Sequence, residues 1–422
     1  MTEEGCVIFN ACLYMALFCF WWNKHKGLNS GTYILLIWSV CSLVGVFYEP
    51  VNIYGHMRKI ILWPYLYLFV CNCLMFIPIL AFKAERLRHI SINNRLLIPL
   101  GIVLGIISIP PFVESSIYYY INHSNTQMML DAFNDRYADA STTYSYLSTF
   151  SKRLTYILHS VRTLSLFLLF YMPVIYTPKK SFKFAYIGVC LSVVLIVLES
   201  LILLARFQVV IYGLYGFFIY LILRNLYNEK LRTVASRYMK ILAIAFVSLQ
   251  IVQTASRYLI YTENLGQQEV GTIAYLGQYL GESMGNFNGN IVHSDYYFGA
   301  DPILKTYADF LHIPLEKTVY REGRFHTNQF FTVVGEFWRA YGGIATFVIF
   351  IIFPLWLYIG VRHVNYKKVS CAFLILFFMY SKMAVVGIFY HAYFVDKDEL
   401  LVMPLIVILL SFKAHKKFQI LR

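Results

Sequence analysis

Seven ionisable residues fall inside runs of apolar residues that are long enough to cross a membrane. They are Arg162, Glu199, Arg206, Arg257, Glu336, Arg339 and Lys382. A charged side chain in a hydrocarbon layer is costly unless it is paired or hydrated, so each position is a candidate for function. Most of the seven are cations, and a planar guanidinium can donate two parallel hydrogen bonds to phosphate oxygens. The set predicts a binding site for an anionic group, of which a lipid-linked phosphate or diphosphate is the most abundant candidate.

Structural pairing is an alternative explanation for several of these charges. Glu336 and Arg339 stand three residues apart and could satisfy one another on one helix face. Arg162 could pair with Glu199 as readily as with a ligand. Lys382 is expected to be a counter-ion for Glu199 or Glu336.

Two further cations have polar surroundings along the chain. Arg257 ends a stripe with Gln250, Gln253 and Thr254, which predicts a helix face turned to the bundle interior or to water. Arg206 follows Glu199 by two helical turns, so the two would share a face if one helix continued through Ala205.

A histidine stands before one of the apolar runs, in the stretch "RFHTNQFFTVVGEFWRAYGG" that begins at Arg324. His326 and Asn328 precede the run, and Arg321 and Arg324 lie close in sequence. Neighbouring cations disfavour protonated imidazole, which leaves a neutral ring able to accept a proton. His326 is therefore a candidate general base.

The acidic stretch "DKDE", with Asp396, Asp398 and Glu399, could imitate the Asp-x-Asp element of metal-dependent transferases. It lies in a short predicted outer loop, where acidic residues are also expected for topological reasons. No zinc-binding or nucleotide-binding motif accompanies it. We expect no metal and no cofactor.

The elements that must position these residues are membrane helices. Of the 422 residues, 59% are hydrophobic and only 14% are charged, against about 25% in soluble globular proteins. A helix needs about 20 apolar residues to cross the hydrocarbon layer. The sequence predicts an all-α, polytopic membrane helix bundle forming one integral-membrane domain over 1–422. The expected spans, about eleven, are 5–22, 31–48, 60–82, 96–113, 155–177, 184–204, 207–223, 241–261, 331–359, 369–390 and 400–412.

Loop charges predict the orientation of the bundle. Lys and Arg are more frequent in alternate loops, which places the N-terminus outside and the C-terminus in the cytoplasm. The net charge of +14 is therefore a topology signal and a contact with membrane lipids, and no nucleic acid partner is expected. Under this topology the seven buried charges lie in the outer halves of their helices.

Two outer loops are too long to be simple turns, namely 114–154 and 262–330. The second is rich in Tyr, Phe, Gly, Asn and His, which is too aromatic for a disordered linker. We expect it to carry short interfacial helices, such as 301–312. Its aromatic residues would suit contact with sugar rings, or they would form an aromatic belt at the headgroups.

The His-x-Asn element, the polar span entrance and the following "GEFWRAYGGIATFVIFIIF" resemble a signature of bacterial O-antigen polymerases and ligases. The matching residues are His326, Asn328, Glu336, Gly342 and Gly343. The layout of spans, the long outer loop and Arg206 after the sixth span resemble oligosaccharide repeat-unit polymerases in particular. Thr327 separates the histidine from the asparagine here, so His293 and His312 stay open as alternative bases.

The resemblance implies a metal-independent glycosyltransferase in the bacterial cytoplasmic (inner) membrane. It would transfer a glycan from undecaprenyl diphosphate to a sugar hydroxyl of another lipid-linked oligosaccharide, on the outer face. The implied roles are His326 and Glu336 in catalysis, and Arg206, Arg257, Arg339 and Arg162 on the diphosphate. Asn328, Arg324, Arg321 and His293 would contact the glycan or support these residues. A chain-length regulator is a further candidate partner.

Two other functions would use similar residues. A ligase would move finished glycan to a different acceptor, and this sequence does not separate the two. A flippase would carry the lipid-linked oligosaccharide across the membrane without chemistry. Such a carrier needs polar groups along its full depth, whereas the inner halves of these spans are nearly free of charge.

Overall fold

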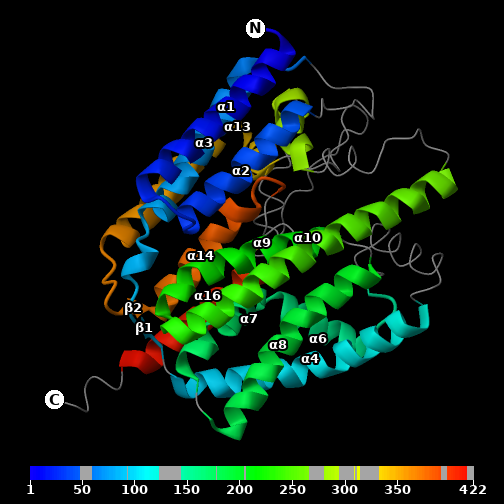
Figure 1. Cartoon of the computed structure of the whole chain (residues 1–422), viewed down its shortest axis with the longest axis vertical. Helices are drawn as coiled ribbons and strands as arrows, with labels where there is room; N and C mark the ends of the chain where they lie inside the picture. Colours follow the sequence, from blue (N-terminus) through cyan, green and yellow to red (C-terminus); the bar gives the residue numbers. More distant parts are fainter. Residues whose placement is uncertain are drawn as a thin grey trace. The chain divides into compact units, whose positions relative to one another are not determined.

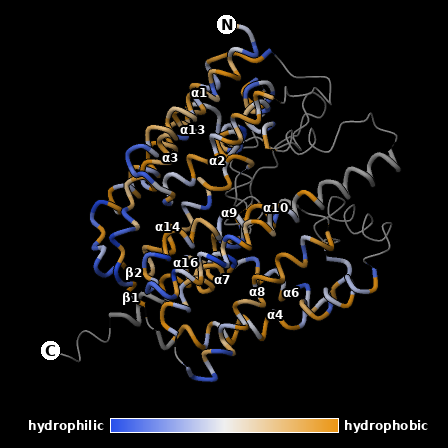
Figure 2. The backbone as a smooth tube through the Cα atoms, in the orientation of Figure 1, coloured by the Kyte–Doolittle hydropathy of each residue, from blue (hydrophilic) through white to orange (hydrophobic). Residues whose placement is uncertain are grey.

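In the residues that it describes, the structure, a computed structural model of the chain, is helical apart from one short strand pair (Figure 1). It describes residues 1–47, 59–92, 94–122, 144–176, 178–203, 206–265, 280–293, 308, 311–313, 332–390 and 397–415. Apolar residues run along whole helices, as the orange stretches of Figure 2 show. Many of them are exposed, for example Ile344 at 86% and Trp356 at 66%. Such exposure is expected of side chains that face lipid.

Within the described residues, seven helices are long and apolar enough to cross a membrane. They are α1 (Glu3–His25), α2 (Ser30–Phe47), α3 (Leu62–Ala81), α4 (Asn94–Asn122), α8 (Lys180–Ile202), α9 (Arg206–Leu223) and α13 (Val333–Arg362). Helices α6 (Thr149–His159) and α7 (Arg162–Tyr171) are together long and apolar enough to cross a membrane, but they are bent by 66° where they meet. If this bent pair is a single broken span, the described residues contain eight spans. The chain is therefore a multi-pass membrane protein by helix length and hydropathy.

The predicted count of eleven spans is not confirmed. Three predicted runs do coincide with helices, α10 (Glu229–Leu265), α14 (Cys371–Val386) and α16 (Lys397–His415). Within the described part of the chain, none of the three is among the helices that qualify as spans, and α14 is too short because it has only 16 residues.

The chain divides into two compact units. The first comprises Met1–Leu87, Val270–Lys367 and Phe377–Lys397, and the second Arg88–Glu269, Lys368–Leu376 and Asp398–Arg422.

Buried polar side chains join the helices of the first unit. Tyr14 of α1 accepts a hydrogen bond of 2.7 Å from the Asn72 amide of α3, and Trp38 of α2 donates to the Ala384 carbonyl at 2.9 Å. Helix α13 is broken at Gly342, whose φ of 77° is a conformation that residues with a Cβ rarely adopt. Tyr67 of α3 donates to the Gly343 carbonyl at this break, at 2.6 Å. Hydrogen bonds between helices of this kind replace the water that lipid cannot supply.

The second unit is built around a close crossing of α4 and α8. A Cβ added at Gly188 of α8 would lie 2.8 Å from the Gly105 Cα and would also meet the Gly101 carbonyl oxygen. Small residues allow backbones to approach in this way, which is common where membrane helices associate. The carboxylate of Glu114, on α4, accepts hydrogen bonds from the backbone and hydroxyl of Ser148 and from the Ser151 hydroxyl, at 2.6–2.8 Å. It thereby holds the first turn of α6 against α4.

A two-residue parallel pair also belongs to the second unit. Strand β1 (Ile90–Ser91) pairs with β2 (Val369–Ser370), with Ile90 opposite Val369.

The long outer segments are partly helical. Helix α4 continues to Asn122 and α10 continues to Leu265, so both helices extend into the predicted loops. A helix over 280–286 leads into a π-helical turn, η4 (Phe287–Ile291), whose residues are buried. The interfacial helix predicted at 301–312 lies mostly outside the described residues.

Candidate functional site

Ionisable side chains gather inside the second unit, where α6 ends and α7 begins. Helix α6 ends at His159, and α7 starts at Arg162 after the turn at Ser160 and Val161. The Arg162 side chain is 3% exposed, and that of Glu199, on α8, is 1% exposed. A broken helix in a membrane protein exposes backbone polar groups that need partners, and such breaks commonly form binding sites.

Glu199 is the centre of this cluster because one of its oxygens has two partners. Arg162 donates from Nη2 to Glu199 Oε2 at 2.8 Å, and the His159 Nε2 lies 3.2 Å from the same oxygen. The Arg162 guanidinium also lies over the ring of Tyr212, 4.8 Å from its centroid. The guanidinium offsets the charge of the Glu199 carboxylate, since an isolated buried carboxylate would be unfavourable.

His159 is the C-terminal residue of α6, and its ring is held by two groups. Its Nε2 lies 3.1 Å from the Tyr144 hydroxyl as well as 3.2 Å from Glu199. Burial holds the pKa of Tyr144 well above its usual value, with Glu199 acting in the same direction, so the phenol stays protonated. An ionised carboxylate favours the tautomer with hydrogen on Nε2, which donates to Glu199 and leaves Nδ1 with a lone pair.

The N-terminus of α7 carries a second carboxylate. Val161, its N-cap residue, makes no side-chain cap, and Glu399 of α16 accepts from the Thr163 backbone N–H at 2.8 Å. Glu399 is fully buried. An anion at a helix N-terminus is favoured by the exposed N–H groups and by the helix dipole. Two carboxylates from distant parts of the sequence therefore stabilise this break.

Tyrosine rings surround His159. The Tyr144 ring meets the imidazole edge to face with centroids 5.6 Å apart, and the Tyr156 ring lies at 6.4 Å. Tyr146 and Tyr118 extend the cluster, with centroids 4.9 Å apart. Tyr156 is 37% exposed and His159 is 14% exposed, so the cluster is accessible at these two residues.

The site residues predicted from the sequence fall into three groups. Arg162 lies in the second unit and is paired with Glu199, one of its two predicted roles. Arg206 begins α9 and Arg257 lies on α10, both in the second unit. Because α8 ends at Ile202, no continuous helix places Glu199 and Arg206 on one face.

The second group lies in the first unit. Glu336 and Arg339 are in the first turns of α13, where Arg339 is buried, and His293 follows η4. Lys382 is fully buried on α14.

The third group, His326, Asn328, Arg324 and Arg321, lies outside the described residues.

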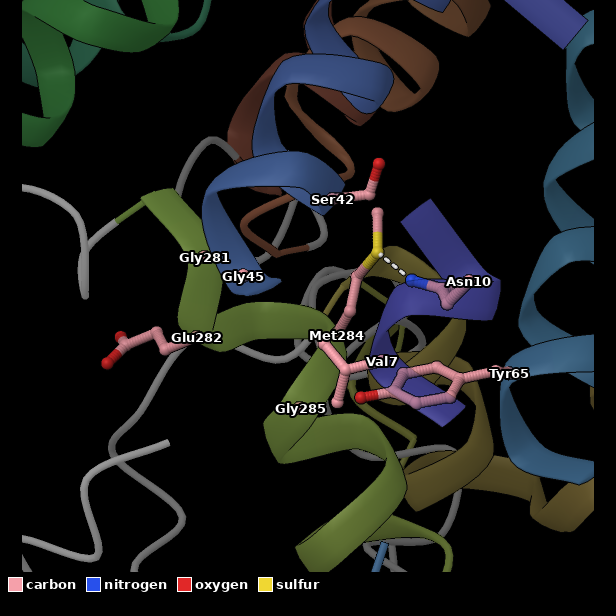
Figure 3. Close-up of a pocket in the computed structure, with 9 residues that line it drawn as sticks. All are labelled: Val7, Asn10, Ser42, Gly45, Tyr65, Gly281, Glu282, Met284 and Gly285. Atoms are coloured by element: carbon pink, nitrogen blue, oxygen red, sulfur yellow. Dashed lines mark hydrogen bonds between the residues drawn. The ribbon is translucent and has the colours of Figure 1, made fainter. Parts of the chain in front are cut away.

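A small pocket in the first unit holds none of these residues (Figure 3). Helices α1, α2 and α3 line it together with 280–286, and α2 and 280–286 meet at Gly45 and Gly281. Asn10 donates to the Met284 sulfur at 3.0 Å, while the Glu282 carboxylate points away from this contact. The pocket has no arrangement of groups that suggests chemistry.

Sequence analysis missed His159, Tyr144 and Glu399 as members of the cluster. The one available signal was the position of His159 three residues before Arg162, close to the start of an apolar run. The sequence predicts Glu399 in a short outer loop, whereas in the structure its carboxylate accepts from the backbone of Thr163, 236 residues earlier in the chain.

The fold and the composition define a polytopic, helical membrane protein with ionisable groups buried at a helix break. No protein-family model matches the chain, and neither does any curated protein or any solved structure.

Proposed function

We propose that this membrane protein polymerises lipid-linked oligosaccharide repeat units. It would transfer the growing glycan from undecaprenyl diphosphate to a sugar hydroxyl of another lipid-linked unit, on the outer face of the cytoplasmic membrane. The observation that best supports this proposal is the buried cluster of Arg162, Glu199 and His159 at the α6–α7 break. Charges at this depth are costly and indicate function by default.

The proposed reaction follows from the residue types. Breaking the bond between sugar C1 and the diphosphate oxygen places negative charge on the leaving group, and fixed guanidinium donors stabilise that charge. Arg206, Arg257 and Arg339 are the proposed donors. Arg162 has the supporting role, because Glu199 already neutralises it.

A base must also remove the proton of the acceptor hydroxyl. Imidazole is suited to this task near neutral pH, and the family resemblance implies His326, with Glu336 orienting His326 or Arg339. Diphosphate is a fair leaving group, so the proposal requires no metal.

Deletion of the gene in its own host tests the proposal against its rivals. A strain without the polymerase should accumulate single repeat units on the lipid carrier, exposed at the outer face. Exposure is measured by oxidising the glycan with periodate in intact cells under conditions in which the inner leaflet is protected. Lipid analysis by mass spectrometry then gives the length of each glycan.

The other two functions give different results. Loss of a flippase would leave single units protected from periodate, on the inner face. Loss of a ligase would leave long glycans on the lipid carrier. Either pattern would contradict the proposed polymerase, and a plasmid copy of the wild-type gene should restore normal glycans in every case.

A further inference from the structure

His159 has the surroundings of a positioned base. Its Nε2 faces the Glu199 carboxylate and the Tyr144 hydroxyl, and within the described residues its Nδ1 makes no hydrogen bond. A base oriented through its other nitrogen by a carboxylate is the arrangement that activates nucleophiles in many enzymes. Arg162 in turn donates a hydrogen bond to Glu199, so the carboxylate that orients the imidazole is itself held in place.

The tyrosines beside His159 indicate which substrate would reach it. A sugar ring has an apolar face, which packs on aromatic rings, and hydroxyl edges, which need hydrogen-bond partners. Tyr156 is the most exposed ring that contacts His159, and its centroid lies 6.4 Å from the imidazole. A sugar packed on Tyr156 would bring a hydroxyl within reach of Nδ1.

We infer that His159 is the proton acceptor of the proposed glycosyl transfer, with the acceptor sugar bound against Tyr156. This inference rests on the proposed function and replaces His326 as the base. The acceptor oxygen forms a bond to C1 of the donor sugar, and its proton passes to Nδ1 of His159. The bond from C1 to the diphosphate oxygen breaks, and the diphosphate leaves with the electron pair. The imidazolium then returns its proton to water.

Three matched glutamine variants of the full chain in lipid nanodiscs test the inference. In His159→Gln the amide can still donate to Glu199 but cannot accept a proton, so folding should be preserved. His326→Gln tests the alternative base, and His363→Gln is the control, because His363 is an exposed cap of α13. The probe is the single-unit lipid diphosphate extracted from the deletion strain.

We expect His159→Gln to slow chain growth by roughly 100-fold or more, the usual contribution of a general base. His363→Gln, the control, should leave chain growth near the wild-type rate. Growth that survives in His159→Gln but is lost in His326→Gln would overturn the inference and leave the polymerase proposal intact. Thermal unfolding of each variant shows whether a loss is merely structural.

The pH profile separates a base from a structural residue. Wild-type rates should fall in acid as the base is protonated, and the slow residual rate of His159→Gln should lack this limb. Among the residues that the structure describes, the titratable and charged groups that face His159 are Tyr144, Tyr156, Glu199 and, through Glu199, Arg162. Asp398 acts on Tyr156 from α16.

A measurement that does not depend on enzymatic activity is needed if neither the wild type nor any variant extends a glycan. Nitrogen NMR of histidine-labelled protein should show a ring with hydrogen on Nε2 and a bare Nδ1 whose signals are missing from His159→Gln, which assigns them to His159 among the eleven histidines. If His159 of the wild-type protein carries its hydrogen on Nδ1, the inference is wrong whatever the activity. The expected tautomer in an inactive protein would instead refute the proposed polymerase while leaving the oriented imidazole established.

Discussion

The Arg162–Glu199 pair is sensitive to single substitutions because both side chains are buried. Removing one partner leaves an uncompensated charge away from water, which costs about 3–5 kcal/mol in buried pairs. We expect Arg162→Met or Glu199→Gln alone to lower the unfolding free energy by that amount. The measurement is reversible unfolding in mixed detergent micelles.

The double variant Arg162→Met with Glu199→Gln is the matched control. Because both charges are removed together, it should recover most of the loss seen in Arg162→Met alone. Additive losses in the double variant would show that the two side chains do not depend on one another.

Tyr156 gives a second prediction, on substrate binding. Tyr156→Ala removes the ring on which the acceptor sugar would pack, so KM for the acceptor should rise about threefold to tenfold with kcat nearly unchanged. Tyr156→Phe keeps the ring and should behave almost as wild type. Initial rates at a series of acceptor concentrations give both constants, and an unchanged KM in the alanine variant would exclude this platform.

The roles of single residues were only partly predictable. The sequence left the pairing of Arg162 with Glu199 open as one of two alternatives, and the structure contains that pair. His159 and Tyr144 could not be recognised, because their partners lie on other elements and no spacing rule joins them. The structure leaves the roles of Arg206, Arg257 and Arg339 as predictions.

Helix positions were predictable because each apolar run of about 20 residues must be helical in lipid. Each of the eleven predicted runs overlaps a helix, and among the described residues seven helices qualify as single spans. The break between α6 and α7 was not predicted, since the stretch "LTYILHSVRTLSLFLLF" contains no proline or glycine. The break is instead stabilised by tertiary contacts, above all by Glu399 at the Thr163 backbone.

The α4–α8 crossing gives a prediction about helix packing. In Gly188→Ala the new methyl group would lie 2.8 Å from the Gly105 Cα, so the helices must separate. Overpacking of this kind costs about 1–3 kcal/mol, which should appear as a lower Tm.

Gly216→Ala on α9 is the matched control for this crossing. The nearest atom to its new methyl group would be a Leu166 side-chain carbon at 3.5 Å, an ordinary contact. Alanine also favours the helix by up to about 1 kcal/mol, so this variant should be as stable as wild type or more stable. Equal effects at both positions would show that the α4–α8 contact is not tight.

The class of the whole protein followed from composition alone, because 59% hydrophobic residues and 14% charged residues exclude a soluble globular chain. The exact number of spans did not follow from composition. Helix α14 has only 16 residues, and α6 and α7 count as a span only if the two helices, bent by 66°, cross together. The proposed orientation rests on loop charges and can be measured directly.

Cysteine labelling of intact cells tests the orientation. In a background with the exposed Cys12 and Cys19 replaced by alanine, Tyr120→Cys near the end of α4 should react with a membrane-impermeant maleimide. His363→Cys after α13 should react only after the cells are opened. The reverse pattern would place the His159 cluster at the cytoplasmic face and would contradict transfer on the outer face.

The central claim is that this protein joins lipid-diphosphate-linked repeat units to one another without a metal. Purified wild-type protein in nanodiscs is incubated with single repeat units on undecaprenyl diphosphate, in excess chelator, and the glycans are separated on a ladder gel. The account predicts a ladder of products at successive multiples of the repeat unit. Single units that stay unextended, or a ladder that forms only after a divalent ion is added, would contradict it.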